Sequence, residues 1–359
     1  MKPQTSTSTP IHFTLPFILF FTALPAQANQ PISPAANASI DRALAYLKQT
    51  QQADGDWPHG STAGTTAVPS LAVMAFLSRG HTPGQGPYGQ TLNAAIDLVL
   101  RAQQLEGPKR GLLAHDDSNV VMYEHGIATV MLTEAYGMVD DARRSKIDRA
   151  LSLALQLIID AQSAEKTNPK DRGGWRYALN SPDSDISVTG WQLMALRGAA
   201  NCGAAIPPDV LEKGAQYVAR CASEKGGFAY QSDAGEPNVA RTGTGLLSTL
   251  LITGNSASPQ IQKAADYLKA NPPDRSTPFY YYAIYYDSQA LNQLGGTYWH
   301  TVYPKLVQNL LPLQQPDGSF APAADGQESE AGPAYRTSMA TLALTVPLRY
   351  LPLYQSEKH

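Results

Sequence analysis

Cysteine is almost absent from this sequence. Only Cys202 and Cys221 occur among its 359 residues. Each is expected near the end of a helix, and the helical rise of about 1.5 Å per residue separates the two by roughly 20 Å. A disulfide joins residues whose Cα atoms are less than about 7 Å apart, so we expect both thiols to stay unpaired. The fold must therefore rely on a hydrophobic core.

Charged residues are also few, at 16% of the sequence, and neither sign dominates. Lysine and arginine number 27 against 30 aspartate and glutamate, which gives a net charge of −3. Nucleic acid is not an expected partner, because phosphate binding requires a basic face. Hydrophobic residues make up 43%, enough for a large core and for an apolar cavity within it. The sequence identifies no protein partner.

Long apolar runs are absent after the first 28 residues, which are typical of a secretory signal peptide. Lys2 precedes an apolar stretch over 11–24 that Pro16 interrupts, and Ala26-Gln27-Ala28 places small residues at the cleavage spacing. The stretch falls short of the roughly 20 residues that span a bilayer, so an uncleaved anchor is the weaker alternative. We expect cleavage after Ala28, export to the periplasm or beyond the cell, and no transmembrane segment in the mature chain.

A linker over 29–38, rich in proline, alanine and asparagine, leads to one large domain at 39–355 and a short tail at 356–359. Within this domain a glycine-aromatic turn recurs between an amphipathic segment and a more apolar one. Its clearest copies are QQADGDW (51–57), GGWRY (173–177), GGFAY (226–230) and QQPDGSF (314–320). A two-helix unit of about 40–60 residues cannot bury its apolar face alone, so such units stack side by side.

Apolar periodicity predicts six helical hairpins in the domain. The first helix of each pair has a polar face and is expected outside, and the second is apolar nearly all round and is expected inside. The predicted pairs are Ser39–Gln52 with Thr66–Ser78, Thr91–Gln104 with Met122–Tyr136, Lys146–Gln162 with Ser187–Ala200, Pro208–Ala222 with Arg241–Ile252, Pro259–Ala270 with Phe279–Leu294, and Trp299–Gln314 with Tyr335–Leu344. Six pairs without an obvious capping repeat favour an all-α fold, a single (α/α)6 toroid, over an open α-solenoid.

The glycine-aromatic turn has a structural role in this arrangement. Glycine permits the positive φ of a tight reversal. The aromatic residue, such as Trp57 or Phe320, is expected to wedge between neighbouring hairpins. The preceding glutamine, such as Gln51 or Gln314, is expected to bond free backbone groups at a helix end.

Candidate functional residues gather where the inner helices begin. The inner helices of such a ring run parallel, so their N-termini surround one mouth and direct unpaired N–H groups and partial positive charge at it. Aromatic side chains nearby can wall a cavity and stabilise a cation, although core packing is the competing interpretation for those within helices. The candidate ligand-binding residues are Tyr123, Glu124, His125, Trp175, Ser187, Trp191, Arg241, Tyr281, Tyr285, Tyr335 and Arg336.

The sharpest local signal is the pair Asp183 and Asp185, directly before the apolar helix at 187–200. Close carboxylates raise each other's pKa, as does an apolar wall, so one of them can stay protonated and act as a general acid. The alternative is that Asp185 is only the N-cap of that helix. Glu124 beside His125 offers a second acid–base pair, but adjacent helical residues point about 100° apart, so at most one faces the axis.

The segment GGWRYALNSPDSDISVTGWQLMAL (173–196) resembles the squalene/hopene and oxidosqualene cyclases. In that family a Gly-Gly-aromatic turn precedes a Pro-Asp-x-Asp-Asp-Thr stretch, the middle Asp protonates a double bond or epoxide, and aromatic side chains stabilise the carbocations. The resemblance puts Asp183 on the first Asp and Asp185 on the proton-donating one. Ile186 replaces the third Asp and Ser187 the Thr, and this chain supplies one toroid where those enzymes use two.

Other segments more closely resemble exported bacterial proteins with prenyltransferase and squalene oxidase repeats, a group that brings no substrate with it. They are MYEHGIATVMLTEAYGM (122–138), FYYYAIYY (279–286) and AYRTSMATLAL (334–344). The zinc-binding Asp-x-Cys of protein prenyltransferase β subunits and the Cys-Gly-Glu-Gln thioester of complement-like toroids do not occur. The histidines show no ligand spacing, so we expect no metal and no other cofactor.

Two functions from different classes stay open. The first is a squalene cyclase-like protein that takes an apolar isoprenoid-type ligand into the central cavity, with Asp185 as the acid and Asp183 as its partner. The second is a non-catalytic exported binding or scaffold module. Ile186 in place of an acid favours the second, and the two aspartates favour the first. A carbohydrate-active toroid is a third option, because Glu124 with Asp185 could supply its two carboxyl groups.

Overall fold

The computed structural model describes residues 32–58, 65–115, 118–232, 235–323 and 328–355. The predicted signal peptide and the tail at 356–359 lie outside the described residues. Helix α1 begins at Pro34, because the Ser33 hydroxyl accepts a hydrogen bond from the Ala36 N–H and caps the helix. The predicted start of the first helix at Ser39, after a linker that reaches residue 38, is therefore wrong: Ser39 is a buried residue inside α1.

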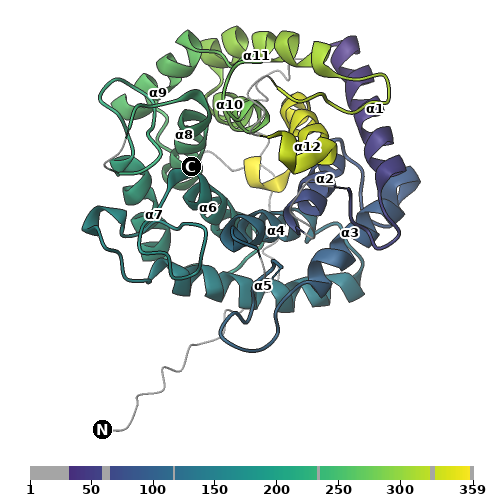
Figure 1. Cartoon of the computed structure of the whole chain (residues 1–359), viewed down its shortest axis with the longest axis horizontal. Helices are drawn as coiled ribbons and strands as arrows, with labels where there is room; N and C mark the ends of the chain where they lie inside the picture. Colours follow the sequence, from purple (N-terminus) through teal and green to yellow (C-terminus); the bar gives the residue numbers. More distant parts are fainter. Residues whose placement is uncertain (1–31, 59–64, 116–117, 233–234, 324–327, 356–359) are drawn as a thin grey trace, which may run out of the picture.

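Twelve α-helices form six hairpins in the described part of the chain, and Figure 1 shows six of them as an inner ring within the other six. The outer helices are α1 (Pro34–Thr50), α3 (Gly89–Arg101), α5 (Asp141–Gln162), α7 (Pro208–Arg220), α9 (Pro259–Ala270) and α11 (Gly296–Leu310). The inner helices are α2 (Ala67–Ser78), α4 (Val121–Ala135), α6 (Ile186–Asn201), α8 (Val239–Thr253), α10 (Tyr280–Leu294) and α12 (Gly332–Leu344). None of these helices is long and apolar enough to cross a membrane.

The ring is closed, which confirms the toroid and excludes the open solenoid. Helix α12 packs against both α1 and α2, so the last hairpin contacts the first. The Thr345 hydroxyl donates to the Ser78 hydroxyl at 2.8 Å, which joins the ends of α12 and α2. On the outside, the Gln314 side-chain amide donates to the Ser39 carbonyl at 2.8 Å.

Apolar patterning explains which helices lie inside. Every residue of α2 from Val68 to Ser78 is buried, as expected for a helix that is apolar all round. In the outer helix α7 the buried residues are Val210, Gly214, Tyr217 and Val218, which follow a helical period on one face. The division into inner and outer helices predicted from periodicity is confirmed.

The glycine-aromatic turns bond their own hairpin through the aromatic side chain and approach the next hairpin through the glycine. The indole N–H of Trp57 donates to the Leu47 carbonyl at 2.6 Å, and that of Trp175 to the Ile158 carbonyl at 2.8 Å. Gly55 has a φ of 101°, and a Cβ on it would lie 2.4 Å from the Ala94 carbonyl oxygen of the next outer helix. Only glycine fits both the turn conformation and this close approach.

Candidate functional site

Carboxylates bond the N-termini of three of the six inner helices at the mouth of the ring, α2, α6 and α10. The Glu124 carboxylate accepts a hydrogen bond from the Thr66 N–H, at the start of α2, at 3.1 Å. The two oxygens of Glu328 accept from the Tyr281 and Tyr282 N–H groups of α10, at 2.7 and 2.9 Å. The Asn238 side chain caps α8 in the same way. The N–H groups expected to be unpaired are thus largely bonded already, and the expectation that they face a ligand is corrected.

Asp185 caps α6 with one oxygen and keeps the other free. Its Oδ1 accepts hydrogen bonds from the Ser187 and Val188 N–H groups, both at 2.9 Å. The residue is 0% exposed, and its Oδ2 is buried without a hydrogen bond of good geometry. Asp185 is therefore an N-cap, as the alternative interpretation proposed, but half of the carboxyl group is not used by the cap.

Burial raises the pKa of Asp185 to about 7. Desolvation is the largest cause, because an ionised carboxylate is unfavourable away from water. The two N–H groups that it caps, the positive charge of Arg176 and the Tyr230 hydroxyl act in the opposite direction. Of the two physical reasons that the sequence offered for a raised pKa, the apolar environment accounts for the shift.

Asp183 forms an ion pair with Arg176 instead of a carboxyl pair with Asp185. Arg176 Nη1 lies 2.7 Å from Asp183 Oδ2, and the Gln231 side-chain amide contacts the same oxygen at 3.3 Å. The Asp183 side chain is 38% exposed. Arg176, the partner of Asp183, is also a group whose charge lowers the pKa of Asp185.

Half-buried tyrosines from four places in the ring surround this acid. The Tyr123 and Tyr177 rings stack at a centroid distance of 6.0 Å, and the hydroxyls of Tyr177 and Tyr230 are hydrogen-bonded. Tyr282 of α10 bonds the Thr244 hydroxyl at 2.7 Å. Asp185 lies close enough to raise the pKa of Tyr123, Tyr230 and Tyr282 through its charge, in addition to the larger effect of burial.

Two guanidinium groups lie over these rings. Arg176 sits 5.0 Å from the centroid of Tyr177 and 5.5 Å from that of Tyr230. Arg241 also lies over the Tyr230 ring, 5.0 Å from its centroid. Arg176, Tyr177, Tyr230 and Tyr282 were not among the selected ligand-binding candidates. The signal for Tyr177 and Tyr230 lay in the turns, since GGWRY and GGFAY both end in a tyrosine two residues after the aromatic residue of the motif, and Tyr282 belongs to the segment FYYYAIYY.

Several predicted site residues belong to the framework and not to the mouth. Both ring nitrogens of His125 bond backbone groups, the Leu113 N–H at 3.0 Å and the Ala154 carbonyl at 3.1 Å, and burial lowers its pKa to about 4. The proposed acid–base pair of Glu124 and His125 is therefore wrong. Three more candidates bond backbone carbonyls of neighbouring segments through their side chains, namely Trp175, Tyr281 and Arg336.

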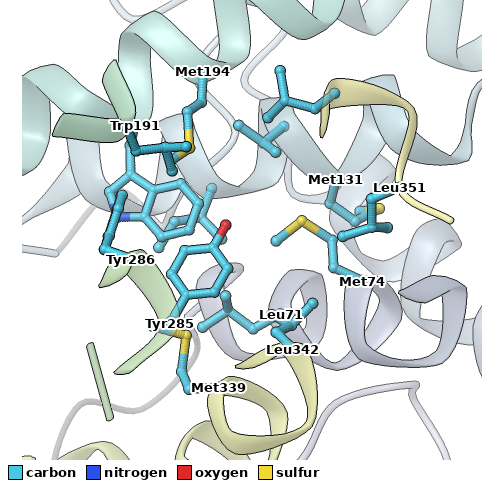
Figure 2. Packing of buried hydrophobic residues seen from close by; sticks show 14 of the residues in the cluster. Leu71, Met74, Met131, Trp191, Met194, Tyr285, Tyr286, Met339, Leu342 and Leu351 are labelled. Atoms are coloured by element: carbon cyan, nitrogen blue, oxygen red, sulfur yellow. The ribbon is translucent and has the colours of Figure 1, made fainter. Parts of the chain in front are cut away.

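The remaining candidates occupy two levels. Ser187 interacts with the hydroxyls of Tyr123 and Tyr282, and Tyr335 donates to Glu328 at 3.1 Å, so both belong to the mouth. Trp191 and Tyr285 are each 1% exposed and stack on one another at 5.8 Å. These two rings lie among the buried apolar side chains of the ring's centre, which Figure 2 shows.

Side chains fill the centre of the ring below the mouth. Methionines from four inner helices point into it, together with Leu71, Leu342, Trp191 and Tyr285. These methionines are Met74, Met131, Met194 and Met339, each at most 1% exposed. The open central cavity expected from the sequence is corrected to a packed core.

Figure 1 shows the C-terminal segment turning into the centre of the ring, and its contact with Glu134, near the C-terminal end of α4, places it at the end opposite the mouth. After α12 the chain turns across the inner helices, and Leu351 and Leu353 are buried. The Leu353 N–H donates to Glu134 at 2.9 Å, and the hydroxyl of Tyr354 lies 2.6 Å from that of Tyr285. Ligand access from this end would require displacement of the segment.

Metal-ligating side chains do not gather at the mouth, since the described residues contain no group of three or more histidine, cysteine, aspartate and glutamate side chains placed to hold a metal ion. The chemistry that this arrangement can perform rests on one acid, Asp185, with aromatic rings and two guanidinium groups beside it.

No protein-family model matches the chain, and no curated protein matches it. Solved structures do resemble it. An α-1,6-mannanase from Salegentibacter sp. HEL1_6 is 10% identical, with a TM-score of 0.61 over 87% of this chain and 99% of that one. Type II terpene cyclase MstE from Scytonema is 16% identical, with a TM-score of 0.54 over 88% and 99%. A glycosidase is 12% identical, with a TM-score of 0.57 over 92% and 100%. These likenesses show a shared α/α toroid fold.

Proposed function

We propose that the mouth of the ring binds an apolar ligand of the isoprenoid type and that Asp185 acts on it as a general acid. One observation carries the proposal: Asp185 keeps a buried Oδ2 that the helix cap does not use, on a carboxyl group whose pKa is about 7. Near neutral pH a large fraction of the molecules then hold a proton there. Matching of the acid's pKa to the working pH favours proton transfer.

The proposed step balances without a cofactor. The O–H bond of Asp185 breaks, and the proton bonds to one carbon of a ligand double bond, whose π electrons form the new C–H bond. The other carbon becomes a cation, which the faces of Tyr123, Tyr177 and Tyr282 stabilise. Loss of a proton from a neighbouring carbon to the Asp185 carboxylate forms a new double bond and restores the acid. The net result is isomerisation. It is cyclisation where the π electrons of a second ligand double bond first attack the cation, form a C–C bond and move the positive charge to the carbon beside which the proton is lost.

The packing of the ring supports the mouth as the ligand site. The centre is filled by buried side chains, whereas the mouth tyrosines are half-buried and present both rings and hydroxyls. The similar terpene cyclase binds geranylgeranyl dihydroxybenzoate as substrate. An apolar chain with a polar end is a suitable ligand for such a surface, because tyrosine offers an apolar face and a polar tip.

A carbohydrate ligand is the second candidate. The mannanase neighbour binds α-1,6-mannotriose, and tyrosine rings also stack on sugars. Glycoside hydrolysis uses two carboxyl groups. Of the described mouth acids other than Asp185, Glu124 and Glu328 bond helix N-termini and Asp183 pairs with Arg176. Because these three carboxyl groups already have partners, we favour proton transfer from the single acid Asp185 over glycoside hydrolysis. A purely binding function uses the same tyrosines without proton transfer.

The decisive comparison is between the mature chain and Asp185→Asn. Asparagine keeps an acceptor oxygen for the cap but cannot supply the proton. Both proteins are offered linear prenyl substrates, squalene and α-1,6-linked mannooligosaccharides, and products are identified by mass spectrometry. We expect rearranged prenyl product from the wild type and none from the variant. Cleaved oligosaccharide would establish the second candidate, and ligand binding without turnover would overturn the acid step. The intact mass of the secreted protein tests the proposed export and cleavage after Ala28.

A further inference from the structure

Glutamine side chains join the outer helices of neighbouring hairpins at four of the six junctions. Each glutamine ends one outer helix, and its amide nitrogen donates both to the carbonyl of the turn glycine and to a carbonyl of the next outer helix. The four sets are Gln51 with Gly55 and Thr91, Gln103 with Gly111 and Ala150, Gln162 with Gly173 and Val210, and Gln314 with Gly318 and Ser39, all at 2.8 to 3.2 Å.

The junction between α7 and α9 lacks this glutamine. Ala222 stands four residues before Gly226 and six before Phe228, the spacing that relates Gln51 to Gly55 and Trp57. A hollow of about 250 Å³ is found here, lined among others by Ala222, Gly226, Gln260 and Lys263. The glutamine is thus missing where this space lies, between α7 and α9 at the turn that leads to Tyr230.

The repeat also identifies the acceptors in this hollow. In each of the four complete junctions, one carbonyl of the next outer helix faces the turn glycine, and the carbonyl three residues before it accepts the hydrogen bond from the glutamine. Ala94 and Thr91 form such a pair, as do Lys213 and Val210. The Lys263 carbonyl faces Gly226, so the equivalent acceptor is the Gln260 carbonyl. In the described chain no hydrogen bond is recorded to the Gly226 carbonyl, which is the other acceptor.

A donor for the amide oxygen is present as well. In the junction that closes the ring, Arg42 donates to the side-chain oxygen of Gln314, and the Arg42 carbonyl faces Gly318. Lys263 occupies the place of Arg42 at the α7–α9 junction, because its carbonyl faces Gly226. A Cβ on the turn glycine would lie 2.3 to 2.5 Å from the facing carbonyl at the four complete junctions and 3.1 Å at Gly226, so this turn is the more open one.

We propose that this hollow is a binding site for a primary carboxamide on a short aliphatic stem, the group that its four counterparts hold internally. Its NH₂ donates to the Gly226 and Gln260 carbonyls, and its oxygen accepts from Lys263. A carboxylate of the same shape has no donor for the two carbonyls, so the site discriminates glutamine from glutamate. The glutamine side chain of a partner polypeptide and a free small amide share this chemistry.

Ala222→Gln provides the sharpest test, because it fills the site from within. Saturation-transfer NMR is recorded with an acetylated, N-methylamide-blocked Ala-Gln-Ala peptide, with its glutamate counterpart, and with propionamide. We expect the glutamine peptide to give a signal with the wild type and at least a fivefold weaker one with Ala222→Gln, and the glutamate peptide to give none with either. Binding of propionamide alone would assign the site to a free amide. Equal signals from both proteins, or none from any probe, would overturn the proposal.

Gln162→Ala is the matched second variant, because it empties a complete junction of the same design. It should acquire a second amide site and show a larger saturation-transfer signal with propionamide than the wild type. If Ala222→Gln fails to fold, the α7–α9 junction does not have the geometry of its counterparts, and the proposal is wrong.

Discussion

Asp183 and Asp185 are two residues apart and lie in opposite electrostatic environments. Asp183 is partly exposed and paired with Arg176 at 2.7 Å, whereas Asp185 is fully buried and has one oxygen without a hydrogen bond. Burial therefore separates the roles of the two carboxyl groups: Asp183 pairs with arginine, and Asp185 is an acid that titrates near neutral pH.

The titration of Asp185 should be visible in protein stability. Burial raises its pKa from 3.8 to about 7, so between these values the folded state holds a proton that the unfolded state has released. The contribution of protonated Asp185 to the free energy of unfolding is therefore fully present below about pH 4 and is lost as the pH rises toward 7. Asp185→Asn cannot ionise, so its free energy of unfolding should increasingly exceed that of the wild type across this window, by up to about 4 kcal/mol. Urea unfolding at pH 4.5 and pH 8 measures the difference, and a gap that does not change with pH would contradict it.

Asp287 provides a second buried acid for comparison. It lies inside α10, is 0% exposed, and neither carboxylate oxygen has a hydrogen bond. Burial raises its pKa well above the usual range, so ionisation opposes folding as the pH rises. Asp287→Asn should raise the free energy of unfolding at pH 8 by about 1–3 kcal/mol and change it little at pH 4. Destabilisation at both pH values would show that the carboxyl group has a partner that the geometry does not reveal.

The fold was largely predictable and the site only in part. Inner and outer helices follow from apolar periodicity, and the turns from Gln51 and Trp57, because such local patterns persist in any packing of the repeats. The roles of His125 and Trp175 could not be read this way, because they depend on which neighbouring backbone groups the ring brings within reach. The packed centre could not be predicted from local patterns either, because the C-terminal segment that packs there contacts Glu134 through Leu353, more than 200 residues later in the sequence.

The glutamine junctions should contribute measurably to stability. Gln162 is buried and donates two hydrogen bonds, so Gln162→Ala leaves two carbonyls without that donor and should cost about 2–3 kcal/mol. Ala222→Gln should add about 1 kcal/mol through the reverse change. Chemical unfolding of both variants beside the wild type tests the pair. Equal small effects would show that the hairpins are held together by packing alone.

The C-terminal segment should be a structural part of the ring. Leu353 is 0% exposed and its own N–H makes the contact with Glu134, so Leu353→Ala should keep that hydrogen bond but cost about 2–5 kcal/mol by leaving a cavity. Leu105→Ala is the same change at a position that is 64% exposed, and it should stay within about 0.5 kcal/mol of the wild type. Thermal unfolding with a dye for exposed apolar surface follows both. Similar melting temperatures for the two variants would show that the segment only rests on the ring.

Arg176, which is paired with Asp183, lowers the pKa of Asp185 against the larger effect of burial, and two variants should move this pKa in opposite directions. Asp183→Asn removes the anion that balances Arg176, so the guanidinium acts more strongly on Asp185 and lowers its pKa. Arg176→Gln removes the favourable charge and raises that pKa. The carboxyl carbon resonance of Asp185, followed by NMR as a function of pH, reports each shift directly. If Asp185 donates the proton, the pH optimum of turnover must move with it. Shifts in the same direction for both variants would show that Arg176 does not connect the two acids, and Asp185 would then owe its acidity to burial alone.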